Sequence, residues 1–191
     1  GLGDVYKRQD DKFAILPYFW IPEDTLELRV RRDHVPYDIW ERQGFLQTTE
    51  GNVVHYGYIE KFIEQLGERF NIREIAFDRW GAVQMVQNLE GMEFTVVPFG
   101  QGFKDMSPPT KELMKLTLEQ KLAHGGHPVL RWMMDNIFIR TDPAGNIKAD
   151  KEKSTEKIDG AIATIIGLDR AIRCGNMNTE SVYDARGILF I

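Results

Sequence analysis

The sequence predicts an α/β fold in which a mixed sheet is flanked by helices. The first observation is a strand, a helix and a second strand in succession within residues 72–99. The second is amphipathic helical spacing in residues 55–70 and again in residues 158–168. Alternating strands and helices build α/β domains, and a chain of 191 residues, 42% of them hydrophobic, can bury one substantial core. We therefore expect one globular domain.

Composition narrows the possible function classes. The formal net charge of -5 argues against a protein that holds nucleic acid by a generally basic surface, because that mode neutralises phosphates with Lys and Arg. Local contact, or contact through metal ions held by carboxylates, is compatible with this charge. Cys174 is the single cysteine, so an internal disulfide cannot form. No apolar stretch approaches the roughly 20 residues that a membrane-spanning helix needs, so we expect no membrane association.

The N-terminal region divides into two parts. Residues 1–9, GLGDVYKRQ, show no clear apolar period and no secretory signal, so we expect a non-native scar that lies outside the fold. From Lys12 the run KFAILPYFW predicts a strand, which Pro17 favours at a sheet edge or a bulge. Pro22 and the acidic residues after it predict a helix through TLELRVRRD, which Pro36 ends.

The central region carries the clearest periodicity. Apolar residues at helical spacing predict a helix over 55–70, and the apolar run after Asn71 predicts a strand that ends on Asp78. A helix over 82–89, closed by Gly91, leads to a strand over 94–99. Such a unit joins parallel strands, and reactive groups gather at the carboxyl ends of those strands, where Asp78 falls.

The C-terminal half is less regular. We expect a loop at 100–109, a mostly helical region at 110–122, a break at 124–127, a short helix or strand at 129–138 and a hairpin turn at 142–146. Ser154 or Thr155 is expected to cap a final helix with Asp159 in its first turn. We expect the domain to occupy residues 10–175, followed by a tail at 176–191.

Two carboxylates stand out by position, Asp78 at the end of a strand and Asp159 at the start of a helix. Placed in one cleft, they could share a hard divalent cation such as Mg²⁺ or Mn²⁺. A strand-ending Asp is also a common turn former, and an Asp opening a helix also favours the helix dipole. Glu156 precedes Asp159 by one helical turn and could face the same cleft, although the neighbouring lysines make a solvated charged face an equal alternative.

The remaining motifs give little indication of function. His124 and His127 flank two glycines without further ligands at zinc spacing, so they are interpreted as loop residues. Neither a Walker-type phosphate loop nor a G-x-S-x-G elbow occurs, and the Gly-Gln-Gly at 100–102 is too short for a dinucleotide fingerprint.

Eight collinear segments from Lys12 onward resemble the C-terminal nuclease domain of tailed-phage terminase large subunits. They are KFAILPYFWIPEDTL, VPYDIWERQGFL, GNVVHYGYIE, IREIAFDRWGA, VVPFGQGFKDMSPPTKEL, HGGHPVLRWMMDN, RTDPAGNIKADK and STEKIDGAIATIIGLDRA. The resemblance implies a ribonuclease H-like, metal-dependent endonuclease that cuts concatemeric DNA with two Mg²⁺ or Mn²⁺ ions. It further implies that Asp78 and Asp159 are catalytic metal ligands, with Glu156 as an additional metal ligand.

The resemblance also implies binding partners, and the sequence differs from the family in one respect. The partners are double-stranded DNA and, in the intact system, the terminase small subunit and the portal protein, in the cytoplasm of the host cell. The family carries a further catalytic Asp on a central first strand, which is not recognisable here, so we expect the sheet to lack its first strands and the chain to be poorly folded or inactive alone. Two other interpretations stay open: a non-catalytic module that docks the packaging motor on portal or DNA, and another ribonuclease H-like enzyme such as a junction resolvase.

Overall fold

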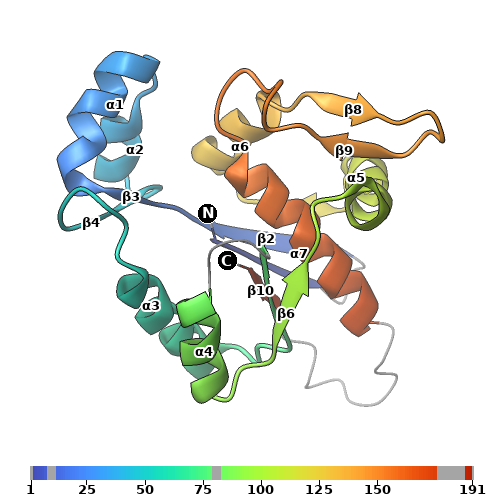
Figure 1. Ribbon diagram of the computed structural model, residues 1–191, viewed down its shortest axis with the longest axis horizontal. Coiled ribbons are helices and arrows are strands. Elements are labelled where there is room, and N and C mark those ends of the chain that lie inside the picture. Colours follow the sequence, from blue (N-terminus) through green and yellow to red (C-terminus); the bar gives the residue numbers. More distant parts are fainter. Residues whose placement is uncertain (1, 8–11, 79–82, 176–187, 191) are drawn as a thin grey trace.

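A mixed β-sheet forms the middle layer of the molecule (Figure 1). The computed structural model describes residues 2–7, 12–78, 83–175 and 188–190. The sheet has the strand order β6-β5-β10-β1-β2-β7. Its strands are β1 (Leu2–Lys7), β2 (Phe13–Tyr18), β5 (Ile75–Asp78), β6 (Val96–Phe99), β7 (Leu122–Ala123) and β10 (Ile188–Phe190). Two smaller sheets pair β3 (Trp20–Pro22) with β4 (Gln47–Thr49) and β8 (Ile139–Thr141) with β9 (Ile147–Ala149).

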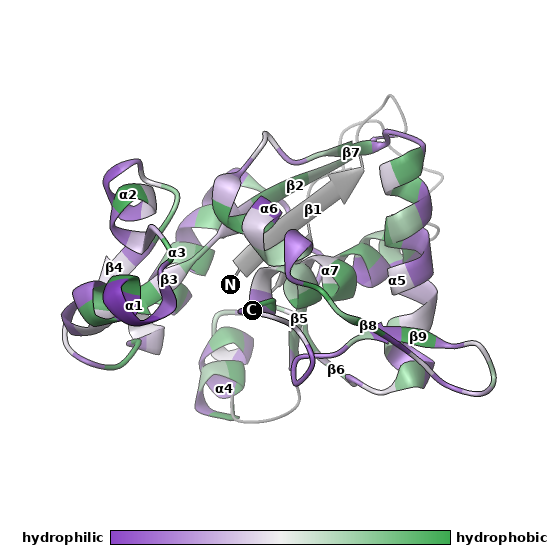
Figure 2. Cartoon of the chain, turned by 90° about the horizontal axis from the view of Figure 1, so that it is seen from above, coloured by the Kyte–Doolittle hydropathy of each residue, from purple (hydrophilic) through white to green (hydrophobic). Residues whose placement is uncertain are grey.

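Helices cover the sheet on both faces. The helices of the described residues are α1 (Leu26–Asp33), α2 (Tyr37–Arg42), α3 (Tyr56–Arg69), α4 (Val83–Gly91), α5 (Phe103–Leu118), α6 (Pro128–Asp135) and α7 (Asp159–Gly175), with a 3₁₀ turn, η1 (Glu23–Thr25), before α1. Helices α1 and α2 lie to the side of this sheet, next to β3 and β4 (Figure 1). Successive residues of a strand point to opposite faces. Ile75 accordingly packs with α3 and α4, whereas its neighbour Ala76 packs with α5, α6 and α7. Figure 2 shows hydrophobic residues along β2 and α7, where the second of these cores forms.

The central prediction is confirmed. The expected helices and strands of residues 55–99 are present as α3, β5, α4 and β6, and β5 pairs with β6 in parallel. Helix α3 buries Ile59, Ile63 and Leu66, the residues whose spacing predicted it. The hairpin turn at 142–146 is also confirmed, since β8 and β9 are antiparallel across it. Pro36 separates α1 from α2, and the segment 129–138 begins as a helix, α6.

The expectation that residues 1–9 lie outside the fold is wrong. Leu2–Lys7 form β1, which pairs with β2 along its whole length, from Leu2 opposite Tyr18 to Lys7 opposite Phe13. Residues 2–7 have no local apolar period, and the strand is supplied by ladder pairing, with the neighbouring β2 and with the C-terminal β10. A non-native origin of the segment is a separate matter and stays a prediction.

The centre of the sheet is filled from the other end of the chain. Strand β10 pairs antiparallel with β1 and parallel with β5, so it lies between the antiparallel and the parallel strands. This is the position that we expected a missing first strand to leave vacant. Residues 188–190 therefore belong to the sheet and not to a tail, and their backbone groups pair on both sides.

Two helix starts differ from the prediction. Helix α5 begins at Phe103, inside the expected loop, and contains Pro108 and Pro109. Prolines normally mark the first turn or a break, but here Met106, Pro109 and Thr110 are buried, so packing against the core holds the helix. Helix α7 begins at Asp159 and not after Ser154, because residues 151–158 form turns in which Ser154 Oγ donates to the Asp150 carbonyl.

Candidate functional site

Asp78 lies where β5 ends, as predicted. It stands opposite Phe99, the last residue of β6, in the parallel register. Two residues beyond Phe99, Gln101 reaches back across the strand ends, and its Nε2 donates a hydrogen bond of 2.6 Å to Asp78 Oδ2. A carboxylate at the carboxyl edge of two parallel strands is thereby oriented by an amide from the neighbouring loop.

The loop that carries Gln101 is held from several sides. Gly100 lies against the Asp105 carboxylate so closely that a Cβ at this position would collide with it. Lys148 Nζ, from β9, donates to the Gln101 carbonyl at 3.3 Å and lies 5.3 Å from the centre of the Phe103 ring. Helix α5 begins directly after this loop, with Gly102 as its N-cap residue. The β8–β9 hairpin thus supports the loop that orients Asp78.

Asp159 is the first residue of α7 and its side chain is 50% exposed. Its Oδ1 lies 3.0 Å from Lys151 Nζ, a side chain that is itself 47% exposed. Partial burial works to raise the pKa of the Asp159 carboxyl, but the charge and hydrogen bond of Lys151, with a smaller contribution from Lys157, hold that pKa below its usual value. Asp159 is therefore an accessible carboxylate, ionised at neutral pH, with one exchangeable partner.

A close helix approach fixes the backbone beside Asp159. A Cβ added to Gly160 would lie 2.5 Å from Phe19 Cε1 and 2.9 Å from Met133 Sδ. Phe19, buried between β2 and β3, also contacts the ring of His127, at 5.4 Å between centroids. Only a glycine lets α7 start this close to its neighbours, so residue 160 sets where the Asp159 carboxylate stands.

Asp78 and Asp159 lie toward the same end of the sheet. Near the other end of α7, Arg170 Nε pairs at 2.6 Å with Glu74, the residue just before β5. Helix α7 runs antiparallel to β6 and to its parallel neighbour β5 (Figure 1). The path from Arg170 back to Asp159, about 16 Å at 1.5 Å per residue, therefore follows the direction of these strands. The start of the helix therefore lies toward the carboxyl ends of the strands, where Asp78 stands.

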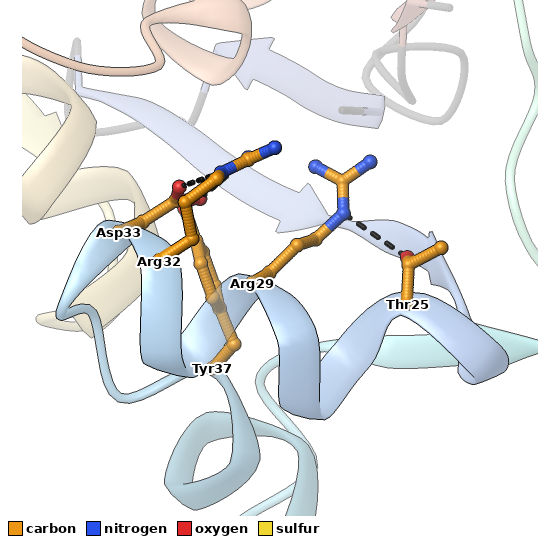
Figure 3. Close-up of polar contacts among 5 residues, drawn as sticks. All are labelled: Thr25, Arg29, Arg32, Asp33 and Tyr37. Carbon is orange, nitrogen blue, oxygen red and sulfur yellow. Dashed lines mark hydrogen bonds and ion pairs between the residues drawn. The ribbon is translucent and has the colours of Figure 1, made fainter.

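Glu156 does not stand one helical turn before Asp159, because it lies in the turns ahead of α7. Its charge instead acts on Arg32 and on Tyr37. Those two residues meet at Asp33, which accepts hydrogen bonds from both (Figure 3). Burial, followed by Asp33, raises the pKa of Tyr37 to about 12. This polar cluster joins α1 to α2. Because α7 begins only at Asp159, the helical argument that placed Glu156 beside Asp159 is wrong.

The described part of the chain contains no group of three or more His, Cys, Asp or Glu side chains that could hold a metal ion. Oxygen ligands such as Asp78 and Asp159 have the chemistry that Mg²⁺ and Mn²⁺ prefer, and water can complete the coordination of one ion. Two carboxylates fall short of the ligand set that two ions would need. His127 caps α6, its Nδ1 accepting the N–H of Leu130, which confirms its interpretation as a structural loop residue.

Sequence reasoning missed Gln101 and Lys148. The Gly-Gln-Gly segment follows the strand adjacent to the one that ends on Asp78, and this order could have indicated that Gln101 lies near Asp78.

In the described residues, none of the helices combines the length and apolar character needed to cross a bilayer.

The sheet order and the helical layers define a ribonuclease H-like α/β domain. A family model described as "Terminase large subunit, endonuclease domain" matches residues 3–174, and the chain belongs to this family. It is 40% identical over 167 residues to "Terminase, large subunit" of Enterobacteria phage HK97, covering 86% of this chain and 33% of that protein. It is 30% identical over 178 residues to "Protein YmfN" of Escherichia coli (strain K12), covering 88% of this chain and 39% of that protein.

A solved structure agrees with these relatives. The chain is similar to the "Crystal structure of the HK97 bacteriophage large terminase", with a TM-score of 0.82 and 37% identity, over 89% of this chain and 36% of that one. The chain thus spans between 33% and 39% of the length of the proteins it matches.

Proposed function

We propose that this domain is a Mg²⁺- or Mn²⁺-dependent endonuclease that cuts double-stranded, concatemeric phage DNA as part of a packaging terminase large subunit. The observation that carries the proposal is the placement of Asp78 and Asp159 toward one end of the sheet, from two different elements. A bound ion would supply charge stabilisation on the phosphate and a more acidic water. Asp78 and Asp159 would hold it, and Lys151 would give up its contact with Asp159 as the ion enters.

The partners of the larger protein follow from the family. We propose double-stranded DNA as the substrate of the domain, with the terminase small subunit and the portal protein as partners of the whole protein in the host cytoplasm. The net charge of -5 is compatible with contact through the metal, because an acidic centre loaded with cations no longer repels phosphate.

The test is Mn²⁺-dependent cleavage of supercoiled plasmid by this chain. Asp78→Asn and Asp159→Asn are each expected to lower this cleavage at least about 100-fold, because each removes a charged metal ligand. Glu64→Gln, an exposed carboxylate on α3 in the opposite layer, is the control and keeps full activity. Glu156→Gln tests in the same assay whether Glu156 is the additional metal ligand that the family resemblance implies.

Two results are informative in opposite directions. Cleavage that requires Asp78 and Asp159 but not Glu64 supports the endonuclease. If the chain with both aspartates intact leaves the plasmid uncut over a range of Mn²⁺ concentrations, the endonuclease proposal fails, and the non-catalytic docking module becomes the better interpretation.

A further inference from the structure

We infer that Gln101 is a positioning residue that fixes the Asp78 carboxylate for metal binding. The inference rests on the proposed function and names a residue that acts on its metal site. The backbone accounts for the contact. Because Asp78 and Phe99 are paired in the parallel register, a residue two positions beyond Phe99 lies just past the strand edge, within reach of Asp78.

The contact is strong and directional. Gln101 Nε2 lies 2.6 Å from Asp78 Oδ2, and both side chains are partly buried. Hydrogen bonds to an ionised acceptor are shorter and stronger than neutral ones. The bond engages Oδ2 and sets the rotation of the carboxylate, which leaves Oδ1 to meet a cation. A glutamine amide adds no charge, so it orients the ligand without competing as a cation would.

The surroundings of Gln101 are built to hold it. Gly100 sits against Asp105, and Lys148 ties the Gln101 carbonyl to β9 while stacking over Phe103. The main chain of Gln101 is therefore fixed on both sides, and its side chain is aimed by a rigid loop. Partners in this position around metal ligands typically change metal affinity by roughly 10- to 100-fold when removed.

The experiment measures Mn²⁺ binding to the full chain directly, by titration calorimetry and by the electron paramagnetic resonance signal of free Mn²⁺. Gln101→Met keeps the length of the side chain and removes the donor. Gln84→Met is the matched control, because Gln84 donates to Asn88 on the exposed side of α4. Asp78→Asn reports the loss of the ligand itself, and thermal unfolding of each variant reports its stability.

We expect Gln101→Met to weaken Mn²⁺ binding at least about 10-fold with little change in melting temperature, and Gln84→Met to leave it unchanged. If Asp78→Asn weakens binding and Gln101→Met does not, the positioning role is overturned and the metal site stands. If neither changes binding, the metal site at Asp78 fails, and the positioning role with it.

Discussion

The two ends of α7 each carry an aspartate in a different environment. At the start of the helix, Asp159 is 50% exposed and pairs with one exposed lysine. Near its end, Asp169 is 7% exposed, and its Oδ2 lies 2.7 Å from Arg173 Nε and 3.6 Å from Arg170 Nη1. Arg170 in turn holds Glu74. A buried carboxylate with two guanidinium partners is part of the structure, whereas an accessible one with a single mobile partner can exchange that partner for a cation.

Cys174, beside the ion pairs of Arg170, supports the conclusion that this end of α7 is structural. Cys174 lies near Glu74, and burial, followed by the charge of Glu74, raises the pKa of the thiol. A thiol with a raised pKa stays protonated at neutral pH and is a poor nucleophile or metal ligand. The C-terminal end of α7 therefore anchors the helix to β5, and the candidate chemistry is confined to the other end.

The largest expected effect is on stability at the buried end. Asp169→Ala removes the partner of Arg173 and one of the two partners of Arg170, so we expect it to lower the free energy of unfolding by roughly 2–3 kcal/mol. Asp159→Ala, on the same helix, should change it by less than about 0.5 kcal/mol. Urea unfolding monitored by tryptophan fluorescence measures both. Equal destabilisation by the two substitutions would remove the distinction drawn between the two ends.

Glycines at the two ends provide the next comparison. Gly160→Ala places a methyl group against Phe19 and Met133 in the core, and overpacking of this kind costs about 1–3 kcal/mol. Gly175→Ala, at the last residue of α7, meets nothing within 4 Å. It should be neutral or stabilising by up to about 1 kcal/mol, because alanine favours the helix.

The same two variants test whether Gly160 positions Asp159 for metal binding. If Gly160 sets the position of Asp159, Gly160→Ala should weaken Mn²⁺ binding as well as lower the melting temperature, whereas Gly175→Ala should change neither in that direction. Gly160→Ala with unchanged melting temperature and unchanged Mn²⁺ binding would show that the start of α7 moves freely and that its close packing does not position Asp159.

The sequence predicted the parts of this comparison that depend on local pattern. Helix α3 and the strand that ends on Asp78 were predictable because the pattern of their buried apolar residues can be seen within each segment alone. The contacts that define the site could not be predicted in this way, because they join residues that are far apart in the sequence. Gln101 meets Asp78 across 23 positions, and β10 pairs with β1 and β5, which both lie far away in the chain. Glu156 was misplaced because turns, and not a helical turn, precede Asp159.

The smallest effect concerns the ion pair at the exposed end. Lys151→Met should change the free energy of unfolding at pH 7 by less than about 0.5 kcal/mol, since exposed ion pairs contribute little. Removing the lysine should raise the pKa of Asp159, because Lys151 is the leading cause of its lowering. Lys153→Met is the control: it removes the same charge from the same turn, where Lys153 Nζ lies over the ring of Phe138.

The sign of the pH dependence follows from the direction of the shift. A carboxyl whose pKa is lower in the folded state than its ordinary value of 3.8 stabilises the fold above that value, and the contribution is lost as the pH falls through the folded pKa. Carboxyl carbon NMR titration of Asp159 below pH 5 should therefore show a lowered pKa in the unsubstituted chain, a higher one in Lys151→Met and an almost unchanged one in Lys153→Met. An Asp159 pKa that is the same in all three would mean that Lys151 does not hold this carboxylate in solution, and that a cation entering the site has no lysine to displace.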